Sequence, residues 1–278
     1  MINALSIDLE FWWSIELLNN HRKDQISEKK DDLVVESVDP LLNLLDRYNV
    51  RATFFVQGMV AEKYPELVAE IYKSGHEIGC HGYSHKTLHD LGEAGFEDDV
   101  KKALVYLRKY RPIGYRAPSF SLNEDTIWAL QILNKYGFQY DSSVFPIKTM
   151  LYGVPDAPLH IYKPSINDLT QKDPRGPVIE FPLTVLKMGK NIPLAGGFYL
   201  RALPLWFLKW GIRCINKKNR PAVIYLHPWE TYTGTPKVQM PLPARIITYY
   251  GLGSTLRKLE GLLKVFRFKP IREVLHDL

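Results

Sequence analysis

The chain has 278 residues, 46% of them hydrophobic, and a formal net charge of +6. That length can bury a large core and favours one large α/β domain. No run of 18 or more apolar residues occurs, which argues against a membrane-spanning helix, and the basic clusters carry no nucleic-acid-binding motif. We therefore do not expect nucleic acid as a partner.

Cysteine content and the first residues bear on the compartment. The two cysteines, Cys80 and Cys214, do not indicate a disulfide framework. The first residues have the pattern of a strand with charged side chains, rather than a basic segment followed by an apolar run and a cleavage site. We therefore expect a cytoplasmic protein.

The first predicted element is a buried strand over residues 4–10. Asp8 and Glu10 are two positions apart in it, so their carboxylates lie on the same side of an extended backbone. Trp12 and Trp13 follow at once, and aromatic rings beside acids suit a sugar-binding site, although such clusters also form cores.

Strands and helices then alternate along the chain. The polar segment 21–32 is predicted as a surface loop or solvated helix, and Ser37 and Asp39 can cap a helix that runs to Tyr48. Further strands are predicted at 52–57 and 76–80, into 115–116 and up to 141, separated by helices at 62–74, 96–110 and 124–136. This order favours a barrel-like or doubly wound parallel sheet, with active-site residues at the carboxyl ends of the strands.

Two histidines follow the strand at 76–80. His81 and His85 are four residues apart, so both imidazoles can share a divalent ion with a carboxylate from elsewhere, and zinc is the first choice. His85 and His89 repeat the spacing, so the pair by itself does not identify a metal site. The adjacent Cys80 is interpreted as a small buried residue and not as a thiolate ligand.

The second half of the chain is less regular. Residues 151–177 are predicted to form a long functional loop over the site, and residues 196–199 a glycine-containing flexible turn. The helix at 203–215 is rich in aromatic and basic residues; we expect it to pack on the sheet, with peripheral membrane contact as the alternative. A last strand at 221–226 leads to His227, and a leucine-rich helix at 255–266 closes the fold.

The chemistry-bearing residues fall into ordered motifs. These are the acids of residues 6–10, the histidines of residues 75–85, Tyr115-Arg116-Ala117-Pro118 and Leu226-His227. With them, residues 6–230 resemble the polysaccharide deacetylases, also called the NodB homology or carbohydrate esterase 4 group. Residues 8–10, 116–121, 140–143, 196–199 and 227–230 are similar to a subgroup associated with exopolysaccharide export systems.

The resemblance implies a distorted (β/α) barrel of about seven parallel strands. It also implies a single catalytic domain over residues 1–278, in which residues 231–278 form a helical extension that packs on the barrel. The substrate would be an N-acetylated saccharide.

The resemblance also assigns roles to residues. Glu10, His81 and His85 would hold the metal, most simply zinc, with cobalt or nickel as alternatives. Leu9 stands where the family has a second aspartate, so Glu10 would act in its place. Asp8 would be the base, with Arg116 orienting it, and His227 the acid, while a backbone N–H near Tyr83 and Ser84 would stabilise the oxyanion. The predicted substrate-binding residues are Trp12, Trp13, Tyr83, Pro118, Phe120, Asp141, Phe198 and Trp229.

Two other functions remain open from the sequence. One is a metal-independent hydrolase of cyclic amides, such as an allantoinase-like or imidase-like enzyme, which the missing second aspartate keeps open. The other is a non-catalytic carbohydrate-binding protein on the same fold. The sequence does not distinguish a polymeric substrate from a nucleotide-linked or lipid-linked one, and it does not predict the oligomeric state.

Overall fold

The structure is a computed structural model that describes residues 1–18, 33–149 and 152–277. The segment predicted as a loop or solvated helix at 21–32 lies outside these residues. Within them, no helix combines the length and apolar character needed to cross a bilayer.

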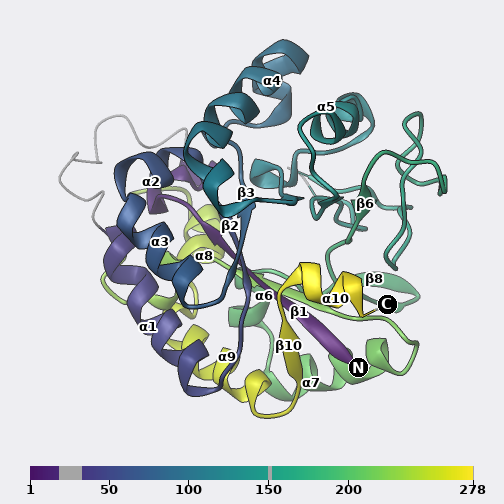
Figure 1. Cartoon of the computed structure of the whole chain (residues 1–278). Coiled ribbons are helices and arrows are strands. Elements are labelled where there is room, and N and C mark those ends of the chain that lie inside the picture. Colours follow the sequence, from purple (N-terminus) through teal and green to yellow (C-terminus); the bar gives the residue numbers. More distant parts are fainter. Residues whose placement is uncertain (19–32, 150–151, 278) are drawn as a thin grey trace.

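A curled sheet of parallel strands forms the centre of the molecule (Figure 1). Seven strands lie in the order β9 (Val223–Leu226), β1 (Ile2–Leu9), β2 (Thr53–Val56), β3 (Glu77–Cys80), β4 (Gly114–Tyr115), β5 (Tyr140–Asp141) and β6 (Ile179–Glu180). Among the described strands, β6 and β9 are not paired with each other, so the sheet does not close. The Val223 N–H of β9 donates instead to Thr184 Oγ1 (2.6 Å), in the segment after β6. This open, curled arrangement confirms the expected distorted barrel of about seven parallel strands.

Residues alternate between two buried faces along the strands, as in other parallel sheets covered on both sides. In β1, Leu5, Ile7 and Leu9 join the large core on the helical side. Ala4 belongs to a second core, in which Phe55 and Tyr140 come from β2 and β5. Ser6 and Asp8, on the same face of β1 as Ala4, therefore point into the barrel.

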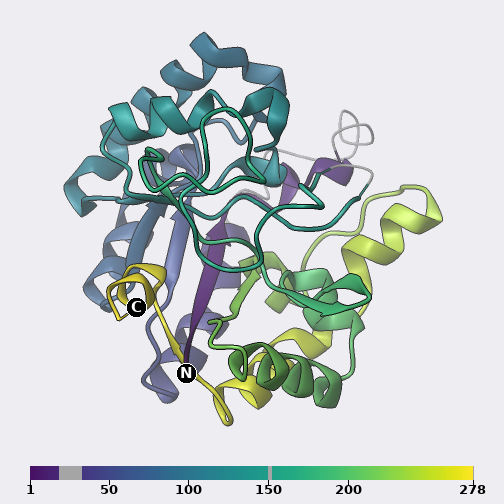
Figure 2. The ribbon, with the colours of Figure 1, turned by 90° about the vertical axis from the view of Figure 1, so that its right-hand side faces the viewer.

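Helices cover the outer face of the sheet. Figure 1 shows α1 and α3 together on one side of the strands. In Figure 2, the loops that follow β5, drawn in teal and green, cross the middle of the view. The helices are α1 (Leu33–Arg47), α2 (Gly58–Lys63), α3 (Pro65–Lys73), α4 (Leu88–Leu107), α5 (Ala129–Lys135), α6 (Gly197–Ala202), α7 (Leu205–Asn216), α8 (Leu242–Tyr249), α9 (Thr255–Leu263) and α10 (Ile271–His276). Strands β7 (Val185–Met188) and β8 (Lys190–Pro193) form a separate antiparallel hairpin.

Several element boundaries differ from those predicted. The helix expected at 62–74 is two helices, because the chain leaves the helical conformation at Tyr64 and Pro65 begins the next one. The helix α4 begins eight residues earlier than predicted, where Thr87 Oγ1 accepts the Asp90 N–H (3.1 Å) and caps it. Ser37, predicted as a cap, lies inside α1, and its hydroxyl donates to Val34 O.

Two segments of the second half also differ. The expected flexible turn at 196–199 is the start of α6, with Gly196 (φ 101°) as the residue before the helix. The segment after residue 231 contains α8, α9 and α10 but also a strand, β10 (Arg267–Lys269), which pairs in parallel with the first residues of β1. The C-terminal segment thus contributes to the sheet itself, and the terminal helix lies close to the N-terminus in Figure 2.

Candidate active site

The register of the strands brings the predicted site residues together. Leu9, Val56, Cys80, Tyr115 and Asp141 lie in one row across the sheet, and Ile7 pairs with Leu226. The residues one position further, including Glu10, His81 and Arg116, therefore leave the strands at the same edge, and His227 follows β9 beside Asp8. Parallel strands place these side chains at one end of the barrel.

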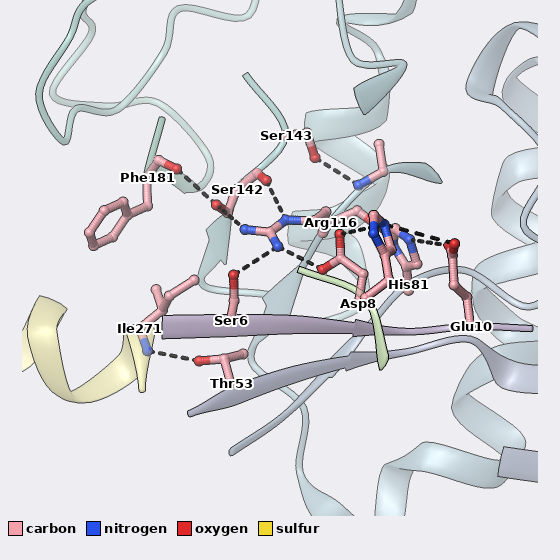
Figure 3. A network of polar contacts seen from close by, with 12 residues as sticks. Ser6, Asp8, Glu10, Thr53, His81, Arg116, Ser142, Ser143, Phe181 and Ile271 are labelled. Atoms are coloured by element: carbon pink, nitrogen blue, oxygen red, sulfur yellow. Dashed lines mark hydrogen bonds and ion pairs between the residues drawn. The ribbon is translucent and has the colours of Figure 1, made fainter. Parts of the chain in front are cut away.

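Arg116 holds the Asp8 carboxylate inside the barrel (Figure 3). The guanidinium is fully buried; its Nη1 donates to Asp8 Oδ1 (2.7 Å) and to Ser6 Oγ (2.9 Å). Its Nε and Nη2 donate to Ser142 O and Ser142 Oγ, both at 2.9 Å. A planar fork bound on three sides fixes the orientation of Asp8.

Glu10, His81 and His85 form a cluster that could hold a metal ion, with their ligand atoms within 4.8 Å of one another. His81 Nδ1 lies 2.7 Å from Arg116 O; donation of its proton to this carbonyl leaves Nε2 unprotonated, 3.6 Å from Glu10 Oε2. His85 Nε2 contacts the same oxygen. Two imidazoles and one carboxylate are a ligand set that suits zinc with one position left for water or substrate, so these residues fit a divalent ion.

The charges of this cluster depend on one another. Burial would raise the pKa of Glu10, but the neighbouring His85 and His227 outweigh it and hold that pKa well below its usual value. Burial would lower the pKa of His85, and the Glu10 carboxylate outweighs this effect and raises it. Glu10 is thus ready to act as an anionic ligand.

His227 faces both acids from the opposite strand. Its Nε2 lies 3.9 Å from Asp8 Oδ2 and 3.8 Å from Glu10 Oε1, and its Nδ1 lies 2.9 Å from Glu230 Oε2. Burial would lower the pKa of His227, but Glu10, Glu230 and Asp8 outweigh it and raise the pKa to about 9. The imidazole can therefore carry a proton toward the acids at neutral pH.

One cavity of about 380 Å³ is lined by Asp8, Glu10, His81, His85 and His227, together with the aromatic residues Phe120, Tyr152, Phe198, Tyr199, Tyr225 and Trp229. The cavity thus combines a cluster of titratable groups with apolar walls, as enzyme sites commonly do.

Comparisons with known proteins agree with this geometry. The family model described as "Polysaccharide deacetylase" matches residues 19–140, which contain His81, His85 and Arg116. Residues 19–140 belong to the polysaccharide deacetylase family. A second model, a domain of unknown function (DUF3473), matches residues 142–276 and contains His227.

Curated relatives that match part of this chain carry the names of peptidoglycan deacetylases. The chain is 34% identical over 107 residues to a peptidoglycan deacetylase of Helicobacter pylori, and 35% identical over 101 residues to a peptidoglycan-N-acetylglucosamine deacetylase of Bacillus cereus. These matches cover 37% and 35% of this chain and 36% and 37% of the relatives. The chain thus spans little more than a third of the length of the relatives it matches.

Solved structures extend the likeness of the fold to nearly the whole chain. A "probable polysaccharide deacetylase" from Pseudomonas aeruginosa is similar with a TM-score of 0.66 at 16% identity, over 99% of this chain and 89% of the other. The Puue allantoinase is similar with a TM-score of 0.63 at 14% identity and the same coverage. At these identities the likeness shows the fold alone.

Glu230 and Arg201 also belong to the site; the sequence named Glu230 only as part of the motif at 227–230, and it did not predict Arg201. Arg201 donates from Nε to Glu230 Oε1 (3.0 Å), and its Nη2 lies 2.8 Å from the same oxygen. Glu230 Oε2 accepts from the His227 backbone N–H (2.9 Å) and contacts the imidazole Nδ1. The spacing of three residues in His227-Pro228-Trp229-Glu230 was a usable signal, but the arginine comes from the distant helix α6.

A glycine makes room for this carboxylate. A Cβ on Gly197 would lie 1.6 Å from Glu230 Oε2, so any side chain at this position would displace Glu230. Burial would raise the pKa of Glu230, but Arg201 and His227 outweigh it and lower that pKa. The charged carboxylate keeps the Nδ1 proton of His227 in place.

The predicted substrate-binding residues are divided by the structure. Phe120, Phe198 and Trp229 line the cavity, whereas Trp12, Trp13, Tyr83, Pro118 and Asp141 are not among the residues that line it. Trp12 is buried in a small core with Trp229, and Trp13 stacks on Phe11 at 4.9 Å. Trp12 packs into the fold, which corrects the expectation that it faces a sugar, whereas Trp13 is half-buried and its role stays a prediction.

Asp141 lies beneath the site and does not face the cavity. Its carboxylate accepts from the Ser143 N–H (2.9 Å) and hydroxyl (2.8 Å), and the Ser143 hydroxyl oxygen accepts the Ala117 N–H (2.7 Å). Asp141 thus supports the backbone next to Arg116 through the Ser143 hydroxyl.

The expected oxyanion donors are also corrected. The backbone N–H groups of Tyr83 and Ser84 donate to the two oxygens of Asp99, at 2.6 and 3.0 Å. The Tyr83 ring lies away from the cavity, where its hydroxyl donates to Glu62 (2.5 Å). Since Asp99 already accepts both protons, these two N–H groups are not free to donate to an oxyanion.

The remaining metal alternatives near the site lose support. Burial raises the pKa of the Cys80 thiol to about 12, so this residue stays protonated and packs in the core. His89 Nε2 lies 2.8 Å from Asn123 Nδ2, outside the Glu10–His81–His85 cluster. Leu9 is fully buried against the helices, and Glu10 takes the acidic place in the cluster.

Proposed function

We propose that the protein is a metal-dependent hydrolase that removes an N-acetyl group from an N-acetylated saccharide. The observation that carries the proposal is the convergence, in one cavity, of a three-residue metal cluster, the Arg116-bound Asp8 and the His227 imidazole, whose Nε2 faces both acids. The names of the relatives, peptidoglycan deacetylases, support the same class of substrate.

The residues divide the reaction between them. A divalent ion held by Glu10, His81 and His85 would supply a Lewis acid for the acetyl carbonyl and lower the pKa of water, and zinc is the first choice. Asp8 Oδ2, on the side facing His227, takes the proton of the attacking water, while Arg116 fixes the carboxylate from its other oxygen.

His227 completes the reaction. Its Nε2 proton passes to the amine nitrogen as the carbon–nitrogen bond breaks, so that one amide and one water give acetate and a free amino sugar. Glu230 keeps the other imidazole nitrogen protonated, which leaves Nε2 as the donating atom. The acid and the base therefore come from neighbouring strands, with His227 directly after β9 and Asp8 within β1.

The aromatic walls suit a sugar. Phe120 and Tyr225 have ring centroids 4.9 Å apart, and Trp229 stacks on His227 at 5.3 Å, so rings flank the acid. The apolar faces of a pyranose can pack on such rings while its hydroxyls reach polar groups. An exopolysaccharide precursor, as the motif subgroup predicts, is the form of substrate that we expect.

Elemental analysis and an acetate assay test the proposal. The purified protein should contain about one divalent ion per chain and release acetate from N-acetylated oligosaccharides, and the His81→Ala/His85→Ala variant should lose both. His89→Ala is the matched control, since this imidazole has the same spacing from His85 but lies outside the cluster; it should keep metal and turnover. Full turnover by the double variant would refute the proposal.

The second candidate is a metal-independent cyclic-amide hydrolase, which the likeness of fold to an allantoinase keeps testable. It would be favoured if the protein bound no metal after supplementation and hydrolysed a hydantoin ring but no N-acetyl sugar.

A further inference from the structure

A second cavity, of about 590 Å³, lies beside the first. Its walls come from the loop after β5 and from the β7–β8 hairpin, and they include Lys148, Lys187 and Lys190. All three lysines are exposed, and no ion pair with a carboxylate joins any of them within the described residues. Of the described residues that line it, one, Asp156, is acidic. We call this cavity the lysine groove.

The two segments that carry the lysines are held together. The Asn191 side chain, at the start of the return strand of the hairpin, donates to Pro146 O (2.7 Å) in the loop. This bond links the hairpin carrying Lys187 and Lys190 to the loop carrying Lys148. The positive charges thus gather on one groove instead of being spread over separate mobile segments.

The lysine groove is continuous with the catalytic cavity. Thr149 and Tyr199 line both of them. The aromatic rings of Phe120, Tyr225 and Tyr199 line the catalytic cavity together with His227, and Tyr199 forms part of the wall of the groove as well. A saccharide bound at His227 can therefore extend past Tyr199 into the groove.

We propose, resting on the function above, that the substrate is an acidic glycan: the lysine groove binds a carboxylate or phosphate of the saccharide whose acetamide lies at His227. Ammonium groups attract anions, and the formal net charge of +6 adds a general attraction for an anionic chain. A neutral glycan would offer no anionic group to the three lysines of the groove. Since the lysines are exposed, the attraction should weaken with salt.

Calorimetric binding tests the proposal independently of turnover. The probes are N-acetylated oligosaccharides of equal length: neutral chitotetraose, a tetrasaccharide of alternating N-acetylglucosamine and glucuronate, and chitotetraose carrying a terminal phosphate. The wild-type protein should bind a charged probe roughly tenfold more tightly than the neutral one at low salt. The variant Lys148→Ala/Lys187→Ala/Lys190→Ala should bind all three about equally. The charged probe that is preferred identifies carboxylate or phosphate as the source of the anion.

A matched control separates the groove from net charge. Lys73, Lys217 and Lys218 are exposed and line neither cavity, so Lys73→Ala/Lys217→Ala/Lys218→Ala removes the same charge elsewhere. This control should keep the preference for charged probes. Equal wild-type affinity for neutral and charged probes, or an equal loss in both triple variants, would overturn the proposal. Preference for a charged probe without acetate release from any probe would refute the deacetylase function while leaving the groove assignment standing.

Discussion

The buried pair of Arg116 and Asp8 gives the sharpest prediction for stability. Both side chains are at most 2% exposed, and their closest atoms are 2.7 Å apart. Arg116→Met leaves the Asp8 carboxylate in the barrel without its counter-charge, which should lower the free energy of unfolding by about 3–5 kcal/mol. Asp8→Asn keeps an oxygen that accepts from Nη1 and loses only the charge, so its effect should be about 1.5–3 kcal/mol.

The double variant measures the interaction itself. Removing both charges leaves neither group unpaired, so its loss should be smaller than the sum of the single losses by about 1–3 kcal/mol. Urea unfolding, followed by tryptophan fluorescence and by circular dichroism, gives each free energy, and agreement of the two signals checks that unfolding is two-state. Acetate release should be lost in all three variants, because Asp8 is absent or no longer oriented.

An exposed pair provides the control. Arg175 lies 3.7 Å from Asp173, but its side chain is 93% exposed, so Arg175→Met should change the free energy of unfolding by less than about 0.5 kcal/mol. The reasoning would be refuted if Arg116→Met were equally mild, or if the losses of Arg116→Met and Asp8→Asn were additive within about 0.5 kcal/mol.

Three further predictions have distinct outcomes. His227→Ala should keep the bound metal, measured by elemental analysis, and lower kcat for acetate release by about 10²–10⁴-fold. Loss of metal in this variant would contradict the role of His227 as the acid. Gly197→Ala, whose Cβ would lie 1.6 Å from Glu230, should lower both kcat and, by about 1–3 kcal/mol, the free energy of unfolding. Gly95→Ala, with its nearest neighbour 3.6 Å away, should instead stabilise the protein by up to about 1 kcal/mol, and equal effects of the two would refute the steric argument. Burial, with Arg51 adding to it, lowers the pKa of His76 to about 4. As the pH falls from 6.5 to 4, the unfolded chain therefore binds a proton at this imidazole before the folded chain does. The free energy of unfolding should fall by up to about 3 kcal/mol over this range. His76→Asn keeps an acceptor for the Ala52 N–H and should flatten this fall in urea unfolding; an unchanged pH dependence would contradict it.

The sequence could predict the positions of Asp8, His81, Arg116 and His227 because each follows a recognisable strand. Strand patterns are local, and parallel strands in register necessarily place the residues after them at one edge of the sheet. The same argument predicted that Asp8 and Glu10 share a side, and the structure has Glu10 beside the two histidines. The alternation of strands and helices predicted a parallel sheet, either barrel-like or doubly wound, and the resemblance to the polysaccharide deacetylases favoured the curled form that the structure has.

Other features depended on contacts between distant parts of the chain. The Tyr83 and Ser84 N–H groups looked available in sequence, but Asp99, on helix α4, accepts both. Residue type alone did not show that Trp12 lies in a core, because an aromatic ring packs equally well on a protein or on a sugar.

The sequence by itself determined which side chains come to the end of the barrel, since hydrophobic periodicity sets where each strand ends. Only the tertiary structure decided which of them work together. Arg201 reaches Glu230, and through it His227, from a helix that the sequence pattern had indicated as a turn. The lysine groove likewise exists because a loop and a hairpin meet at Asn191. Such partnerships arise when packing brings distant segments within hydrogen-bond distance, and no local pattern in the chain encodes that distance.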